Sequence, residues 1–209
     1  MASSPEQLEL IRRARNGDKA AFETLVAPLL DRLFGLAVQL MRNHDDASDV
    51  VQEALVKVYR SLGSFRGDAD FFVWVSRIVR NTVLDELKRA VRRHEEPTET
   101  LPESLDRSLE GKAEQEELQH IVQDCIGQLS VKLREPLVMY DIEGYAYEDI
   151  SQILKLNLGT VKSRLNRARE ALRQKLIGQR HKLAGWIEIP DDGVGRSGGG
   201  KVSNEVPTS

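Results

Sequence analysis

Two apolar stripes at helical spacing lie between residues 143 and 176 and constrain the fold of the chain most strongly. The first stripe consists of Tyr147, Ile150, Ile153 and Leu154. The second consists of Val161, Leu165, Ala168, Leu172 and Leu176. Residues three and four apart share one face of a helix, so each stripe predicts a helix with one buried face. Residues 156–159 interrupt the pattern, and the segment therefore predicts two short helices joined by a tight turn.

The start and the outer face of the second helix carry small polar and basic side chains. Thr160 is of a residue type that caps helix N-termini, and Gly159 before it permits close approach or an unusual backbone angle. When the apolar stripe packs inward, one outward strip holds Lys162, Ser163, Asn166 and Arg167. Such side chains donate hydrogen bonds to base edges and to phosphates.

The charge of this segment differs from that of the chain. Residues 159–182 contain eight Lys or Arg and one acid, whereas the whole chain has a formal charge of −3. A concentrated positive field suits a polyanion. A basic run alone is more often a solvated helix face, but here it follows a tight turn between two helices. The combination predicts a helix-turn-helix whose second helix enters the major groove of DNA.

The composition favours an all-α protein. Leu, Ala, Glu, Arg and Gln dominate, aromatic residues make up 5% of the chain, and alternating β-branched runs are missing. The N-terminus has no apolar signal core, and we find no uninterrupted apolar run of membrane-spanning length. We therefore expect a soluble, cytoplasmic protein without membrane insertion.

Residue types that carry catalysis or bind metals form no recognisable site. The single cysteine, Cys125, is expected to be a small buried apolar group. The four histidines show no metal-ligand spacing, and no phosphate-binding glycine loop or nucleophile elbow is present. We expect no cofactor, no metal and no enzymatic activity.

The first part of the chain predicts further helices and a second basic region. Helices are expected over residues 6–15, 47–62 and 71–91, and over 22–40 with Pro28 as a kink or as the true start. Residues 57–93 contain nine Lys or Arg against four acids. Four aromatic residues are interleaved with them, namely Phe65, Phe71, Phe72 and Trp74. Bases of an unpaired strand stack on such aromatics, although for Trp74 a place in the core is the preferred interpretation.

Composition also predicts the domain boundaries. Residues 95–118 hold nine acids against two bases, together with two prolines. We expect a first helical domain at 1–94, a flexible acidic linker at 95–113, a helix-turn-helix domain at 114–182 and a C-terminal extension at 183–209. The extension is rich in Gly and Ser from residue 191 and is expected to be disordered.

The order of two sequence words resembles one family. DDASDVVQEALVKVYRSLGSFRGDADFFVWVSRIVRNTVLDELKR is followed by LREPLVMYDIEGYAYEDISQILKLNLGTVKSRLNRARE. Over residues 18–176 the chain resembles an extracytoplasmic-function sigma factor, a small promoter-specificity subunit of bacterial RNA polymerase. Two positions depart from the family pattern, because Asn157 stands where many relatives carry Pro and Leu55 replaces a frequent Phe.

This resemblance implies roles for matching residues. The segment that docks on the β′ clamp helices of polymerase contains Asp49, Gln52 and Glu53. The part that reads the −10 element as an unpaired strand contains Lys57, Phe65, Arg66, Gly67, Asp68, Arg77, Arg80 and Asn81. The part that reads the −35 element as duplex contains Thr160, Lys162, Ser163, Arg164, Asn166 and Arg167, with Arg164 and Arg169 expected on phosphates.

The resemblance also implies partners, and it leaves rivals to be tested. The expected partners are the RNA polymerase core, including its β subunit, promoter DNA and an anti-sigma factor. A stand-alone helix-turn-helix regulator would explain the C-terminal half equally well, but not the second basic region or the Asp49–Glu53 strip. A helical nuclease would need clustered carboxylates around a metal, and most acids here lie in the proline-containing linker.

Overall fold

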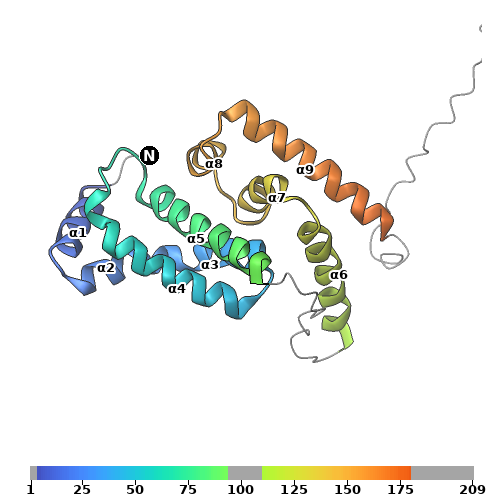
Figure 1. Cartoon of the computed structure of the whole chain (residues 1–209), viewed down its shortest axis with the longest axis horizontal. Helices are drawn as coiled ribbons and strands as arrows, with labels where there is room; N and C mark the ends of the chain where they lie inside the picture. Colours follow the sequence, from blue (N-terminus) through green and yellow to red (C-terminus); the bar gives the residue numbers. More distant parts are fainter. Residues whose placement is uncertain (1–3, 94–109, 180–209) are drawn as a thin grey trace, which may run out of the picture.

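The computed structural model describes residues 4–93 and 110–179, and every regular element within them is helical (Figure 1). The predicted all-α class is confirmed. In chain order the elements are α1 (Pro5–Arg15), α2 (Lys19–Val26), the 3₁₀ turn η1 (Ala27–Leu29), α3 (Leu30–Met41), α4 (His44–Ser61), the 3₁₀ turn η2 (Leu62–Ser64), α5 (Phe71–Arg93), α6 (Glu110–Gly127), α7 (Val131–Leu137), the π-helical turn η3 (Val138–Ile142), α8 (Tyr147–Leu154) and α9 (Leu158–Gly178).

Two predicted segments fall largely or wholly outside the described residues. The extension at 183–209 lies outside them, as does most of the linker at 95–113. Helix α6 begins at Glu110, so the last residues assigned to the linker are helical.

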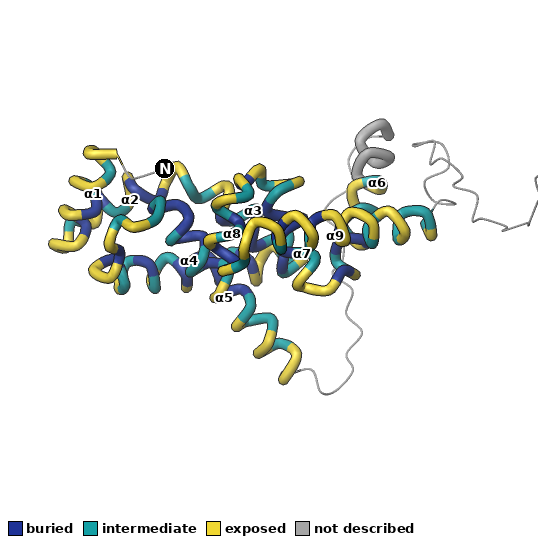
Figure 2. Tube along the Cα trace, turned by 90° about the horizontal axis from the view of Figure 1, so that it is seen from above, coloured by how far each residue is buried: buried dark blue, intermediate teal, exposed yellow. Residues whose placement is uncertain are grey.

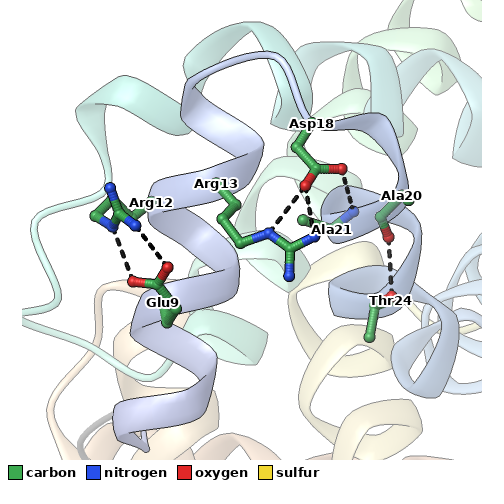
Figure 3. Close-up of polar contacts among 7 residues, drawn as sticks. All are labelled: Glu9, Arg12, Arg13, Asp18, Ala20, Ala21 and Thr24. Atoms are coloured by element: carbon green, nitrogen blue, oxygen red, sulfur yellow. Dashed lines mark hydrogen bonds and ion pairs between the residues drawn. The ribbon is translucent and has the colours of Figure 1, made fainter.

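Polar caps fix the turn between α1 and α2 (Figure 3). Asp18 accepts a hydrogen bond from the backbone N–H of Ala21 at 3.0 Å and so caps the N-terminus of α2. The same carboxylate accepts from Nε and Nη2 of Arg13 at 2.9 and 2.7 Å. Gly17 between the helices has φ +92°, a left-handed conformation in which a side chain would be strained. The turn therefore sets the angle at which α1 lies against α2.

Pro28 divides the long apolar stretch that the sequence presents. It lies in η1, which separates α2 from α3, so residues 22–40 are not one helix. By length and composition alone, the stretch Lys19–Met41 could cross a membrane, although Glu23, Asp31 and Arg32 interrupt its apolar residues. Its residues Leu33, Leu36 and Leu40 are buried in the protein core, as in the core helix of a globular domain.

Helices α3, α4 and α5 form the centre of the first half. Their buried apolar residues include Leu36 and Leu40 on α3, Val50, Ala54 and Val58 on α4, and Val75, Val79 and Val83 on α5. In each helix these positions are three to four residues apart, which is the spacing of one helix face. The C-terminal turns of α5 extend beyond this bundle and are mostly exposed (Figure 2).

The second half packs α7, α8 and α9 around Val161, Leu165 and Ala168. Its apolar residues and those of the first half belong to one continuous core. Helix α5 lies against α8, and α3 lies against α6 and α7. Cys125 on α6 is buried and unpaired, as predicted. The two halves therefore form one packed body in which residues far apart in sequence meet.

Candidate nucleic-acid interface

Helices α8 and α9 form the predicted helix-turn-helix. Lys155 ends α8 in the left-handed conformation, and α9 begins at Leu158. The prediction that Thr160 caps α9 is wrong, because the side chain of Asn157 accepts the hydrogen bond from the Thr160 backbone N–H at 2.7 Å. Gly159 lies within the first turn of α9 and is not among the residues with positive φ. The turn thus depends on Asn157, a residue that caps helices well.

The outer face of α9 carries the predicted strip. Lys162, Ser163, Asn166 and Arg167 are all exposed, while Thr160 and Arg164 are half-buried. The ammonium of Lys162 lies 5.7 Å from the centroid of the Tyr147 ring, which steadies it without covering it. We name these four exposed residues the α9 strip. A helix face with two cations and two short polar side chains can donate hydrogen bonds to base edges in a major groove.

The loop before α5 places only part of its predicted set at the surface. Arg66 and Asp68 are exposed, and Gly67 between them has φ +81°. Phe65, in contrast, is buried, and its ring contacts those of Phe71 and Trp74 at centroid distances of 5.4 and 5.3 Å. In this conformation Phe65 is a core residue that anchors the loop, so its ring is not available for stacking on a base.

The polar face of α5 carries the other predicted residues of the same set. Arg80 donates to Oδ1 of Asn81 at 3.1 Å and also binds Glu135 of α7. Lys57 of α4 reaches α5 through Oγ1 of Thr82 at 3.3 Å. With a rise of 1.5 Å per residue, Asn81 lies about 15 Å along the helix from the loop at its start. The predicted residues therefore form two separate groups, one in the loop and one on α5. We name the group on α5, which consists of Arg77, Arg80 and Asn81, the α5 strip.

The exposed face of α4 holds the predicted acidic and amide residues. Asp49, Gln52 and Glu53 are exposed on successive turns. Glu53 pairs with Lys57 at 2.7 Å and with Arg89 at 3.9 Å, both near the surface. Val56 is also exposed on this helix, so the surface combines carboxylates with an apolar contact.

Comparisons with protein families match both halves. Residues 25–93 match the model of sigma-70 region 2, and residues 119–172 match that of sigma-70 region 4. The chain is 36% identical to the RNA polymerase sigma-H factor of Pseudomonas aeruginosa, over 84% of this chain and 96% of that protein. It is 35% identical to the ECF RNA polymerase sigma-E factor of Haemophilus influenzae, over 84% of this chain and 98% of that protein. The chain belongs to the extracytoplasmic-function sigma factors of the sigma-70 family.

Solved structures agree with this assignment. CnrH, solved in complex with the cytosolic domain of CnrY, is 26% identical with a TM-score of 0.62, covering 83% of this chain and 98% of CnrH. The sigma factor RpoE of Bartonella quintana, solved with the anti-sigma factor NepR, is 25% identical with a TM-score of 0.60, covering 75% of this chain and 96% of RpoE.

Two residues of this sigma factor escaped the sequence analysis. Arg15 at the end of α1 donates to the backbone carbonyl of Leu62 at 3.1 Å and to that of Phe65, the first residue of the loop. Glu135 is buried and binds Arg80. A charged residue that repeats no pattern gives no local signal. The one local hint is the position of Glu135, which follows Arg134 and directly precedes an apolar run in the word LREPLVMY.

Electrostatics around the sites follow burial. Burial raises the pKa of Glu143, and the positive charge of the neighbouring Arg32 partly offsets this rise. Burial raises the pKa of Tyr145 to about 12. Among the described residues, no group of His, Cys, Asp or Glu is placed to hold a metal ion.

Proposed function

We propose that this sigma factor reads its promoter with surfaces on separate helices. The α9 strip would read the −35 element as duplex, with Thr160 beside it and Arg164 on a phosphate. The exposed strip and its placement on the second helix of a helix-turn-helix support this role. The observation that carries the proposal is the presence of regions 2 and 4 of sigma-70, in that order, in one chain.

The −10 element would be held as an unpaired strand by the first half. The loop contributes Arg66 as a cation, together with Gly67 and Asp68. The α5 strip contributes two arginines and the amide of Asn81, and Lys57 lies near this strip. Such groups bind phosphates and the edges of unstacked bases. Phe65 would support the loop from the core.

The α4 face would dock on the polymerase. Asp49, Gln52 and Glu53 form an exposed carboxylate and amide strip that is chemically suited to the basic surface of the β′ clamp helices. The sigma factor would then act without catalysis of its own, in the cytoplasm, where it binds the core enzyme. Since RpoE of Bartonella quintana was solved with the anti-sigma factor NepR, and CnrH with the cytosolic domain of CnrY, we expect an anti-sigma factor for this chain as well.

Transcription in vitro with purified core enzyme on a genomic fragment library tests the proposal. The chain should bind core polymerase and start transcription at defined sites. A stand-alone helix-turn-helix regulator would instead bind a palindromic duplex by itself and leave core polymerase unbound. Failure to associate with core at any salt concentration, with no inhibitor present, would refute the sigma-factor role.

A further inference from the structure

The contact between the two halves is built on the α5 strip. Nε and Nη2 of Arg80 donate to the two carboxylate oxygens of Glu135 at 2.5 and 3.0 Å. The Glu135 side chain is only 3% exposed and that of Arg80 only 21%. A bidentate pair held away from water is strong, and loss of one partner leaves an unpaired charge. This pair therefore ties the first half to α7.

Neighbouring positions on α5 are covered as well. Ser76 is buried, and its hydroxyl lies 3.3 Å from that of Tyr145, which leads into α8. Nε of Arg77 is buried without a hydrogen-bond partner among the described residues. An unpaired buried donor is costly, so this site holds a donor that an incoming phosphate or base could satisfy. The second half thus covers Arg80 of the α5 strip, while Arg77 is half-buried and Asn81 is exposed.

An exposed residue on α3 holds the same two halves together. The guanidinium of Arg32 lies 4.2 Å from the ring centroid of Phe72 and 4.7 Å from that of Tyr145. It also donates to the backbone carbonyl of Glu143 at 3.3 Å. The two rings also contact each other at a centroid distance of 4.9 Å, so the cation lies beside both rings and stabilises their contact. Arg32 therefore stabilises the contact between the two halves through Tyr145 and Glu143, independently of the Arg80–Glu135 pair.

The α9 strip and the α4 face remain exposed in this arrangement. We propose that the α5 strip is a docking surface for the chain's own second half, and that the Arg80–Glu135 pair keeps the free sigma factor closed with its −10 reader masked. The inference rests on the function proposed above. It implies that binding of −35 duplex needs no opening, whereas single-stranded DNA reaches Arg80 only after Glu135 withdraws.

Chemical modification of arginine tests the closure on the full-length chain. Phenylglyoxal modifies exposed guanidinium groups, and peptide mass spectrometry measures the rate at each position. Arg66 on the exposed loop is the internal reference. In the wild type, Arg80 should react about tenfold more slowly than Arg66, because only a small open fraction is reactive. Equal rates at the two positions in the wild type would overturn the proposal.

Two variants release the contact in different ways. Glu135→Ala should bring the rate at Arg80 to within about twofold of that at Arg66 and increase the radius of gyration in solution scattering. Arg32→Ala changes an exposed side chain and so spares the cores of both halves; it should accelerate modification of Arg80 about threefold. If Glu135→Ala shows no cooperative thermal transition, Arg32→Ala decides. Continued protection of Arg80 in the folded variants would refute the closure.

Asp141→Ala is the matched control. It also removes one acid from the second half, but Asp141 pairs with Arg169 within that half at 2.5 Å. Its Arg80 should react as in the wild type. Release of Arg80 by Asp141→Ala would show that a general loss of negative charge, and not the Arg80–Glu135 pair, controls access.

A single-stranded probe separates closure from promoter reading. A 20-nucleotide oligodeoxythymidine should slow modification of Arg80 in Glu135→Ala and leave the wild-type rate unchanged. If Arg80 is released in Glu135→Ala but the oligonucleotide does not protect it, the closure is upheld and the assignment of the α5 strip to the −10 element is refuted.

Discussion

Arg167 is one of four exposed side chains on a single face of α9. An arginine on the groove-facing side of such a helix can donate two hydrogen bonds to one guanine, which gives both affinity and discrimination. Exposure of this side chain follows from helical periodicity, because Leu165 and Ala168 beside it fill the core. Its proposed role can be tested one residue at a time.

Arg167→Ala should weaken binding to a cognate −35 duplex, recovered from the genomic library experiment, by about tenfold or more. Fluorescence anisotropy at fixed salt measures this affinity, with a scrambled duplex for comparison. Lys132→Ala is the matched control, since it removes one exposed cation from α7 instead of α9. Equal affinities of Arg167→Ala and Lys132→Ala for the cognate duplex would rule out base reading by Arg167.

Tyr145 provides a titration signal for the contact between the halves. Burial raises its pKa from 10.0 to about 12. Because the folded-state pKa exceeds that of the unfolded chain, the neutral phenol stabilises the fold fully below about pH 10. This contribution is lost as the pH rises towards 12. Desolvation also raises the pKa of Tyr147, so absorbance at alkaline pH should show late ionisation from more than one of the four tyrosines. Tyr145→Phe should remove the component that ionises last, and its persistence in that variant would assign it to another tyrosine.

At the scale of elements, local sequence signals placed most helices correctly. Helix α1 and the Asp18 cap of α2 follow from spacing and capping residues within a few positions. Local signals did not place the break at Pro28 or the start of α6 at Glu110, since a proline can kink, begin or end a helix and an acidic run does not prevent one. The carbonyls at the end of α4 and η2 are bound by Arg15 of α1, outside the matched region 2.

Arg15→Ala should impair promoter melting by about tenfold while core binding and −35 affinity stay unchanged. Its guanidinium binds the carbonyls of Leu62 and Phe65 and so positions the loop that follows. Permanganate reactivity of thymines in the open complex measures melting. Arg15→Lys should restore only part of the rate, because an ammonium lacks the planar fork of Arg.

Arg12→Ala is the matched control for that experiment. Arg12 lies on the same helix but pairs with Glu9 at 2.6 Å, so its removal should leave melting unchanged (Figure 3). Melting at the wild-type rate in Arg15→Ala would show that the loop holds its position without α1.

At the scale of the molecule, one continuous apolar core spans both halves. Two units that share a core unfold together, so calorimetry of the wild type should give a single transition with equal calorimetric and van't Hoff enthalpies. Glu135→Ala should split it into two transitions or lower the van't Hoff enthalpy, while Asp141→Ala should unfold as the wild type does. Two separate transitions in the wild type would mean that the halves are independent.

Local sequence patterns are sufficient to predict the helical class, the helix-turn-helix, and the exposed residues of α4 and α9. These features depend on periodicity and on capping, which operate over one or two turns. The packing of the helices, in contrast, places Phe65 in the core, brings Arg15 to the loop fifty positions away, and pairs Arg80 with Glu135 fifty-five positions away. Such contacts depend on how helices pack against one another. A single buried charge pair has no periodic pattern in the sequence, so it cannot be predicted from residue spacing.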